Sequence, residues 1–143
     1  MNQKHVPDLE LCQTLDTLCK EKNITLPETE FYYKRFSPHS KNYDLCDDGD
    51  EQCIHSDNKK IPAPLVSELG EWMNKQMARA GTDDALMQSL GAENGFMVWL
   101  ADINHEDYPT IDSWVVEFLE TTEANARQKM LNYLLAEGII TKL

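Results

Sequence analysis

The chain has 143 residues, of which 41% are hydrophobic, and this composition fits one globular domain spanning residues 1–143 rather than a disordered chain. Its 25 acidic and 13 basic residues give a formal net charge of -12, which disfavours direct binding to nucleic acid or to an anionic membrane surface. No apolar run approaches the roughly 20 residues that span a bilayer, and the first residues lack the hydrophobic stretch of a signal peptide, so the expected location is the cytoplasm.

The first part of the chain predicts a helix followed by short strands. Residues 8–22 carry Leu and Cys side chains at helical spacing, and Asp8 is placed to cap the first turn. Residues 30–36 are dense in Phe and Tyr, which favours a strand. Further short strands are expected at 43–46 and near 52–55.

The middle of the chain predicts a second helix and a β-hairpin. Pro64 suits the first position of a helix over 65–80, because its missing N–H would have no partner there. Residues 82–90 are expected to form a short helical turn. Two strands should follow at 96–101 and 114–119, and the first is apolar on both faces, which is typical of a central strand.

The closing segment carries the strongest helix signals. Thr121 or Thr122 can cap its first turn, Glu123 opposes the positive end of the helix dipole, and Gly138 can end it. An apolar stripe runs along one face over residues 126–135. Together the elements predict an α+β fold in the order α-β-β-α-β-β-α, with an antiparallel sheet of about four strands and helices packed mainly on one face.

An acidic segment lies between the two halves. Its six acidic side chains occur without a lysine or arginine among them: Asp44, Asp47, Asp48, Asp50, Glu51 and Asp57. Aligning Gly49 with the glycine of an EF-hand loop puts His55 where a bidentate glutamate is required, so a calcium loop is not expected. We expect a charged projection instead, and these six residues are the predicted contacts with a basic partner.

The four cysteines predict neither a metal centre nor an obligatory disulfide. Cys12 and Cys19 stand seven residues apart on the first helix, about 10 Å along its axis, so they cannot bridge each other. Cys46, Cys53 and His55 could offer zinc ligands, but six residues separate the two cysteines, more than zinc motifs usually have. No cofactor is expected, although the sequence leaves metal binding at these three residues open.

Motifs for catalysis are missing from the sequence. It contains no glycine-rich phosphate loop, no His-Glu-x-x-His and no Gly-x-Ser-x-Gly, and its four histidines fall in predicted tails or loops. Trp72, Trp99 and Trp114 lie within apolar patterns, which favours core packing over base stacking. We therefore expect a protein that is not an enzyme.

Three stretches resemble a known group of proteins. They are Leu26-Pro-Glu-Thr-Glu-Phe-Tyr-Tyr, Ile61-Pro-Ala-Pro-Leu-Val-Ser-Glu-Leu-Gly-Glu-Trp-Met, and the closing segment from Thr122 to Ile140. In their order the chain resembles small, uncharacterised phage and prophage proteins of gut Bacteroidetes-type genomes. The resemblance implies an N-terminal helix, an aromatic strand, a proline-bearing helix, a hairpin and a closing helix. It implies no catalytic residue and does not include the acidic loop at 44–57.

These observations lead to one expected function and two alternatives. The expected function is that of a phage accessory protein in the host cytoplasm, which binds a basic or nucleic-acid-binding host protein and so inhibits a defence or nucleic-acid-handling factor. One alternative is an oligomer that sequesters a nucleotide-like small molecule in a cleft lined by Lys34, Arg35 and aromatic side chains. The other is a structural accessory protein that acts as a homodimer.

Overall fold

The computed structural model describes six parts of the chain: residues 5–35, 41–47, 60–80, 84–92, 95–108 and 110–143. Within them the elements follow in the order α1 (Leu9–Glu21), β1 (Phe31–Lys34), β2 (Asp44–Asp47), β3 (Lys60–Ala63), α2 (Val66–Ala80), β4 (Asp84–Ala92), β5 (Gly95–Asp102), a 3-10 turn (Ile111–Ser113), β6 (Trp114–Glu120) and α3 (Glu123–Ala136). None of the described helices is long and apolar enough to cross a lipid bilayer.

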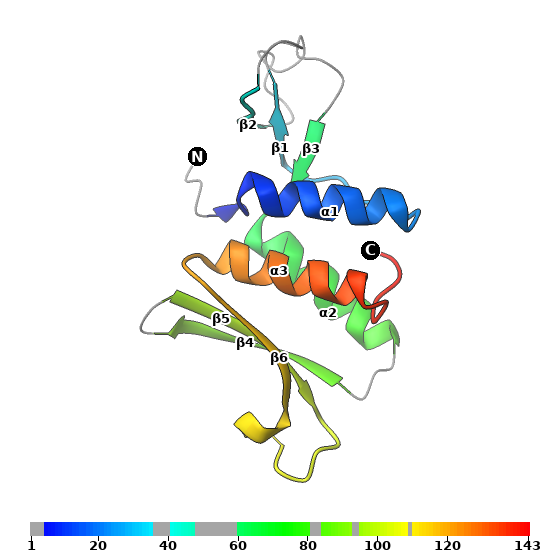
Figure 1. The fold of residues 1–143 in the computed structure, drawn as a ribbon, viewed down its shortest axis with the longest axis vertical. Coiled ribbons are helices and arrows are strands. Elements are labelled where there is room, and N and C mark those ends of the chain that lie inside the picture. The colour runs from blue at the N-terminus through cyan, green and yellow to red at the C-terminus, as the bar shows by residue number, and fades with distance from the viewer. Residues whose placement is uncertain (1–4, 36–40, 48–59, 81–83, 93–94, 109) are drawn as a thin grey trace.

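The helices lie between two antiparallel sheets (Figure 1). A small sheet has the strand order β2-β1-β3, and a larger sheet, which we call sheet B, has the order β4-β5-β6. Helix α1 lies under the small sheet, while α2 and α3 pack on one face of sheet B. The α+β class is therefore confirmed, although the expected strand count and order were approximate: the described strands number six and form two sheets.

Two hydrophobic cores share helix α1. The larger core fills the space between the helices and sheet B, and its large, fully buried members from β5 and α3 are Val98, Leu100, Met130, Leu131, Leu134 and Leu135. The smaller core lies between α1 and the small sheet and contains Cys12, Tyr33 and Ile61. Because Leu15 belongs to the larger core and Cys12 to the smaller one, α1 is buried on two sides.

A polar junction fixes α1 on α3. The backbone N–H of Asp8 donates to Asn125 Oδ1 at 2.8 Å, and Asn125 Nδ2 donates back to the Asp8 carboxylate at 2.9 Å. Further along, Gln128 Nε2 donates to Asn132 Oδ1, and Asn132 Nδ2 donates to the carbonyl of Leu11. Asp8 occupies the N-cap position of α1 as expected, but its side chain makes no capping hydrogen bond there. Its carboxylate holds the neighbouring helix instead.

The closing helix is confirmed together with its end signals. Thr122 Oγ1 accepts from the backbone N–H of Asn125 at 3.1 Å, which caps the first turn. Gly138 has φ of 71°, the left-handed conformation that ends many helices. The N–H of Ile140 donates to the carbonyl of Leu134, so the chain folds back and Ile140 is buried.

Sheet B differs from the expectation at its first strand. Residues 82–90 were expected to form a helical turn, and that prediction was wrong: β4 pairs with β5 from Asp84↔Asp102 to Ala92↔Gly95. The apolar spacing of this segment fits a helix as well as a strand, and the pairing with β5 decides between them. Strand β5 is central in the sheet, as predicted. The strand expected near 52–55 lies outside the described residues, whereas β3 was not expected.

Candidate functional site

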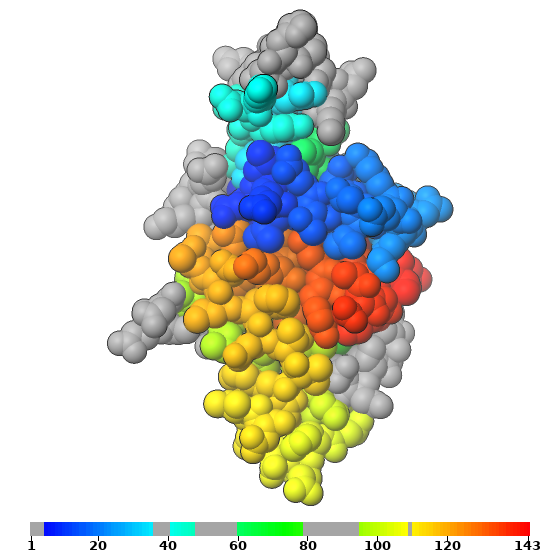
Figure 2. Space-filling model, viewed as in Figure 1, coloured from blue at the N-terminus to red at the C-terminus, as the bar shows by residue number. Residues whose placement is uncertain are grey.

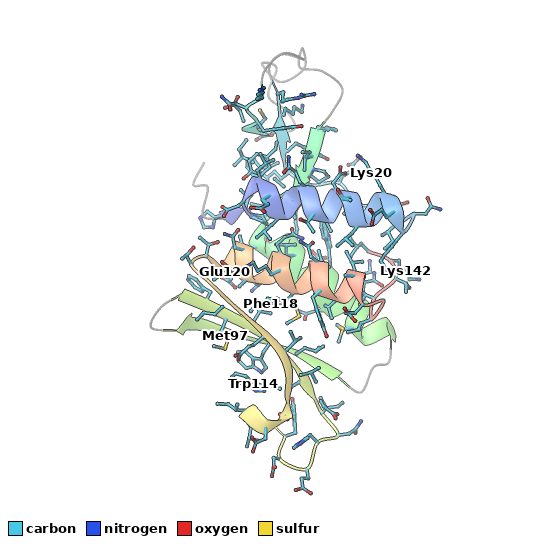
Figure 3. All side chains as sticks on the ribbon, viewed as in Figure 1. Lys20, Met97, Trp114, Phe118, Glu120 and Lys142 are labelled. Carbon is cyan, nitrogen blue, oxygen red and sulfur yellow. The ribbon has the colours of Figure 1, made fainter. Side chains whose placement is uncertain are left out.

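The two faces of sheet B have different surroundings. On β5, Val98 and Leu100 point to the helices and are buried in the larger core, so the alternation of a strand places Met97 and Trp99 on the opposite face. Figure 3 shows Phe118 of β6 on the side of α3, with Met97 and Trp114 on the side away from it. Of the described helices and strands, none packs on that second side (Figure 1), which we call the outer face.

The outer face carries a pair of stacked tryptophans. The ring centroids of Trp99 and Trp114 lie 4.9 Å apart with an interplanar angle of 26°. Cross-strand pairs place further residues beside them, since Met97 pairs with Leu119 and Trp99 with Glu117. The sequence had indicated that both tryptophans pack in the core, but neither belongs to it, and of the three only Trp72 does.

One irregularity in β6 produces this pairing. Leu100 pairs with Val116 and Ala101 pairs with Trp114, so Val115 is an extra residue in the ladder. A regular strand would place Trp114 on the same face as Val116 and Phe118, toward the helices, which is what strict alternation in the sequence predicts. The bulge turns Trp114 to the outer face and brings its ring onto Trp99.

Apolar side chains around this region are exposed to solvent. The exposed fractions are 72% for Ile111, 53% for Val115, 49% for Leu119 and 43% for Ile103, and no other large hydrophobic side chain in the described residues is classed as exposed. All four occur within residues 103–119, in β6 and the connection before it. In Figure 2 this part of the chain, drawn in yellow, projects from the end of the molecule below the helices. This concentration of exposed apolar side chains makes the region the candidate binding surface of the described residues.

The same region is strongly acidic. Residues 80–126 contain ten of the 25 acidic residues and none of the 13 basic ones, so this segment carries a formal charge of -10 and leaves -2 for the rest of the chain. One of the ten, Glu120, forms an ion pair with Lys129 of α3. Lys20 and Lys142 lie near α1 and the C-terminal residues, away from the outer face (Figure 3). This lack of basic residues was visible in the sequence, and it is the signal that the sequence analysis missed.

Two of the six predicted acidic contacts, Asp44 and Asp47, lie at the other end of the molecule. Asp44 and Asp47 are exposed at the two ends of β2, in the small sheet. The structure therefore does not bring them together with the acidic side chains of sheet B (Figure 1). The other four predicted contacts, Asp48, Asp50, Glu51 and Asp57, lie outside the described residues.

The cysteines divide into two kinds. Cys12 and Cys19 are free and buried, and they do not bridge each other, as predicted. Burial raises the pKa of the Cys19 thiol from 9.0 to about 11, with the Asp16 carboxylate adding to the effect. Burial and the Asp8 carboxylate raise the pKa of Cys12 as well. These thiols are poor nucleophiles because the thiolate is the reactive form.

Cys46 differs from these two cysteines and bears on the expectation that no disulfide is obligatory, which stays a prediction. It is disulfide-bonded, and its partner lies outside the described residues, because Cys12 and Cys19 are free. Cys53 and His55 also lie outside the described part. Within the described residues, no three His, Cys, Asp or Glu side chains are grouped so that they could hold a metal ion.

Lys34 and Arg35, which were suggested to line a ligand cleft, lie in or beside the small sheet. Lys34 is buried in β1 with 8% exposure. The guanidinium carbon of Arg35 lies 5.5 Å from the ring centroid of Tyr43, and Lys60 Nζ lies 4.2 Å from that of Tyr32. Such cation–π contacts hold these cations against the aromatic side chains of the small sheet.

Comparison of the chain with protein-family models, curated proteins and solved structures gives no match. The geometry and charge of the outer face are therefore the observations on which a function can be based.

Proposed function

We propose that this is a non-enzymatic binding protein that docks a basic protein on the outer face of sheet B. The observation that supports the proposal is that the stacked, partly exposed Trp99–Trp114 pair lies in the one long segment with ten acidic and no basic residues. Tryptophan is enriched among the residues that contribute most to the free energy of binding at protein interfaces. Acidic residues around an apolar centre speed association with a partner of opposite charge.

The charge selects among possible occupants of this face. A second copy would bring two segments of charge -10 together, so a homodimer formed through the outer face is disfavoured. Nucleic acid is disfavoured for the same reason. A protein whose surface combines basic residues with an apolar patch would match both the negative charge and the apolar side chains of the outer face.

The proposal extends to the biological setting through the resemblance to phage proteins. A host protein that handles nucleic acid would offer the basic surface required, so we propose inhibition of such a factor, or of a defence protein, in the host cytoplasm. The acidic segment from Asp44 to Asp57 is a proposed second contact on a large partner.

Sequestration of a nucleotide-like ligand between Lys34 and Arg35 has less support. Lys34 is buried and Arg35 lies over the ring of Tyr43.

Site-specific photo-crosslinking tests the proposed docking face. A photoreactive phenylalanine analogue would replace Leu119, which is 49% exposed on the outer face, and in a matched variant Thr17, which is exposed on α1. We expect position 119, and not position 17, to form an adduct with a basic protein of the host lysate, in a yield that falls as salt is added. Equal adducts at both positions, or an adduct with an acidic protein, would contradict the proposal. An adduct between two copies of this chain would show a homodimer instead.

A further inference from the structure

Strand β6 forms one edge of sheet B. It pairs with β5 along one side, and no described strand pairs with it along the other. The bulge at Val115 lies at the start of the strand, and the ladder with β5 is regular from Val116 to Glu120. In an antiparallel ladder every second residue of an edge strand directs its N–H and C=O away from its neighbour. This stretch therefore presents backbone donors and acceptors along the edge of the sheet.

These edge groups have no other backbone partner in the described chain. The turn, loop and cap hydrogen bonds formed between described residues do not involve the backbone of residues 115–119. Unpaired groups at a sheet edge are a template on which another extended chain can form hydrogen bonds. The edge of β6 can therefore accept a strand.

Side chains along β6 alternate between packed and exposed positions. Val116 and Phe118 are half-buried and pack against the larger core, whereas Val115, Glu117 and Leu119 are exposed. The helices thus support one face of the strand. The exposed side chains of the other face can contact the side chains of a neighbouring strand, because directly opposite residues have Cβ atoms only about 4.5–5.5 Å apart.

The charge of Glu117 determines which strand fits this edge. In the described part of the chain no basic side chain forms an ion pair with Glu117, whereas Glu120 is paired with Lys129. Opposite charges on directly facing residues stabilise a strand pair, and like charges destabilise it. A second copy that paired its own β6 in register here would set Glu117 against Glu117. The edge therefore disfavours pairing with itself and favours a strand with a basic residue at this position.

We propose that the basic partner adds an extended segment to the edge of β6, as a fourth strand of sheet B. The inference rests on the proposed function, because it specifies how the partner contacts the same surface. A basic residue of the segment lies opposite Glu117, and an apolar residue two positions away lies opposite Leu119. In this mode of recognition, main-chain hydrogen bonds supply affinity and alternate side chains supply specificity.

Titration of the isotope-labelled chain with synthetic peptides, followed by NMR, tests the proposal. The first peptide is Thr-Val-Thr-Arg-Thr-Val-Thr, blocked at both ends, in which a valine can meet Leu119 whichever way the peptide runs. Two matched versions carry the same number of N-methyl groups, one on the valines and the arginine and the other on the threonines that follow them. N-methylation removes a backbone donor, and only one of these two sets of N–H groups faces β6 in an added strand.

We expect the unmodified peptide to bind saturably and to shift the backbone amide signals of β6. One N-methylated version should lose binding and the other should keep it. A peptide with glutamate in place of arginine should bind severalfold more weakly. Glu117→Lys should reverse this preference, while Glu21→Lys, an equal change of charge at an exposed position of α1, should keep the preference of the wild type. The dispersion of the NMR signals establishes that each variant is folded.

Three outcomes would overturn the proposal: no saturable binding of the peptide, equal binding of the two N-methylated versions, or an unchanged preference in Glu117→Lys. Photo-crosslinking at position 119 tests the proposed function separately. If a basic host protein is crosslinked there but the peptide results fail, the partner docks through side chains and the added strand is wrong. If the peptide binds as expected but no basic protein is crosslinked, the edge accepts a strand and the proposed function is wrong.

Discussion

Individual residues decide which side of sheet B can bind. If β6 ran as a regular strand through Val115 instead of forming a bulge there, Trp114 would face the helices, and the outer face would carry one tryptophan instead of a stacked pair. Burial differs in the same way between Leu134 of α3, which is fully buried in the larger core, and Leu119 of β6, which is half exposed on the outer face. Replacing leucine by alanine should therefore change the free energy of unfolding by different amounts at these two positions.

Leu134→Ala should lower the free energy of unfolding by roughly 2–5 kcal/mol, because it removes buried apolar volume and leaves a cavity. Leu119→Ala is the matched control, and its loss should stay within about 0.5 kcal/mol because the side chain is half exposed. Urea unfolding of both variants measures the difference. A loss below about 0.5 kcal/mol for Leu134→Ala would show that this face of α3 is not core.

The buried thiols should make stability fall in alkaline solution. Below pH 9.0 the Cys19 thiol is protonated in both states, but between 9.0 and about 11 it ionises only in the unfolded chain, because its folded pKa is raised. Stability should then fall as the pH rises through this window, and Cys12 should add to the slope. Chemical denaturation from pH 8 to 11 should show a shallower slope in the double variant Cys12→Ala/Cys19→Ala. Identical slopes in the two proteins would contradict this account.

At the scale of elements, the docking of α1 on α3 depends on polar contacts as much as on apolar ones. Asn125 is buried with 5% exposure, and it pairs with both the backbone and the side chain of Asp8. Buried pairs of this kind restrict how one helix can slide along another, since any other register leaves polar groups unpaired.

Asn125→Leu should therefore lower the free energy of unfolding by roughly 1–3 kcal/mol, because the N–H and the carboxylate of Asp8 lose their partner. Asn74→Leu exchanges an exposed asparagine of α2 in the same way and should have an effect within about 0.5 kcal/mol. Thermal unfolding of both variants gives the comparison. An Asn125→Leu protein as stable as the wild type would show that the pair contributes nothing to the fold.

The elements also show what the sequence can and cannot predict. Helix α3 was predicted with its ends, because its cap at Thr122, its apolar stripe and its Gly138 are local signals. Strand β4 was missed because its identity depends on pairing with β5, and β3 because Pro62 within it argues against a strand unless it lies at a sheet edge, as it does here. The place of Trp114 depends on a bulge, which periodicity does not reveal. The class of fold was thus predictable, while the candidate docking face was not.

At the scale of the whole molecule, charge and exposed apolar surface coincide at one end. Sheet B and its flanking segments carry a formal charge of -10, and the exposed hydrophobic side chains of the described residues lie there too. The small sheet at the opposite end carries two exposed acidic residues of its own, Asp44 and Asp47. The central claim is that the first of these regions, and not the second, directs the encounter with a basic partner.

Association kinetics with the protein crosslinked at position 119 test this claim most directly. One variant, the sheet B variant, combines Glu117→Gln in β6 with Asp112→Asn in the 3-10 turn directly before it, and its matched control combines Asp44→Asn with Asp47→Asn in the small sheet. Each removes two negative charges from exposed positions, so the net charge of the two variants is the same. We predict that the sheet B variant associates severalfold more slowly than the wild type at low salt, and that this difference shrinks near 1 M salt, where the Debye length is about 3 Å. Unchanged association of the sheet B variant, or a larger decrease for the variant in the small sheet, would contradict the account.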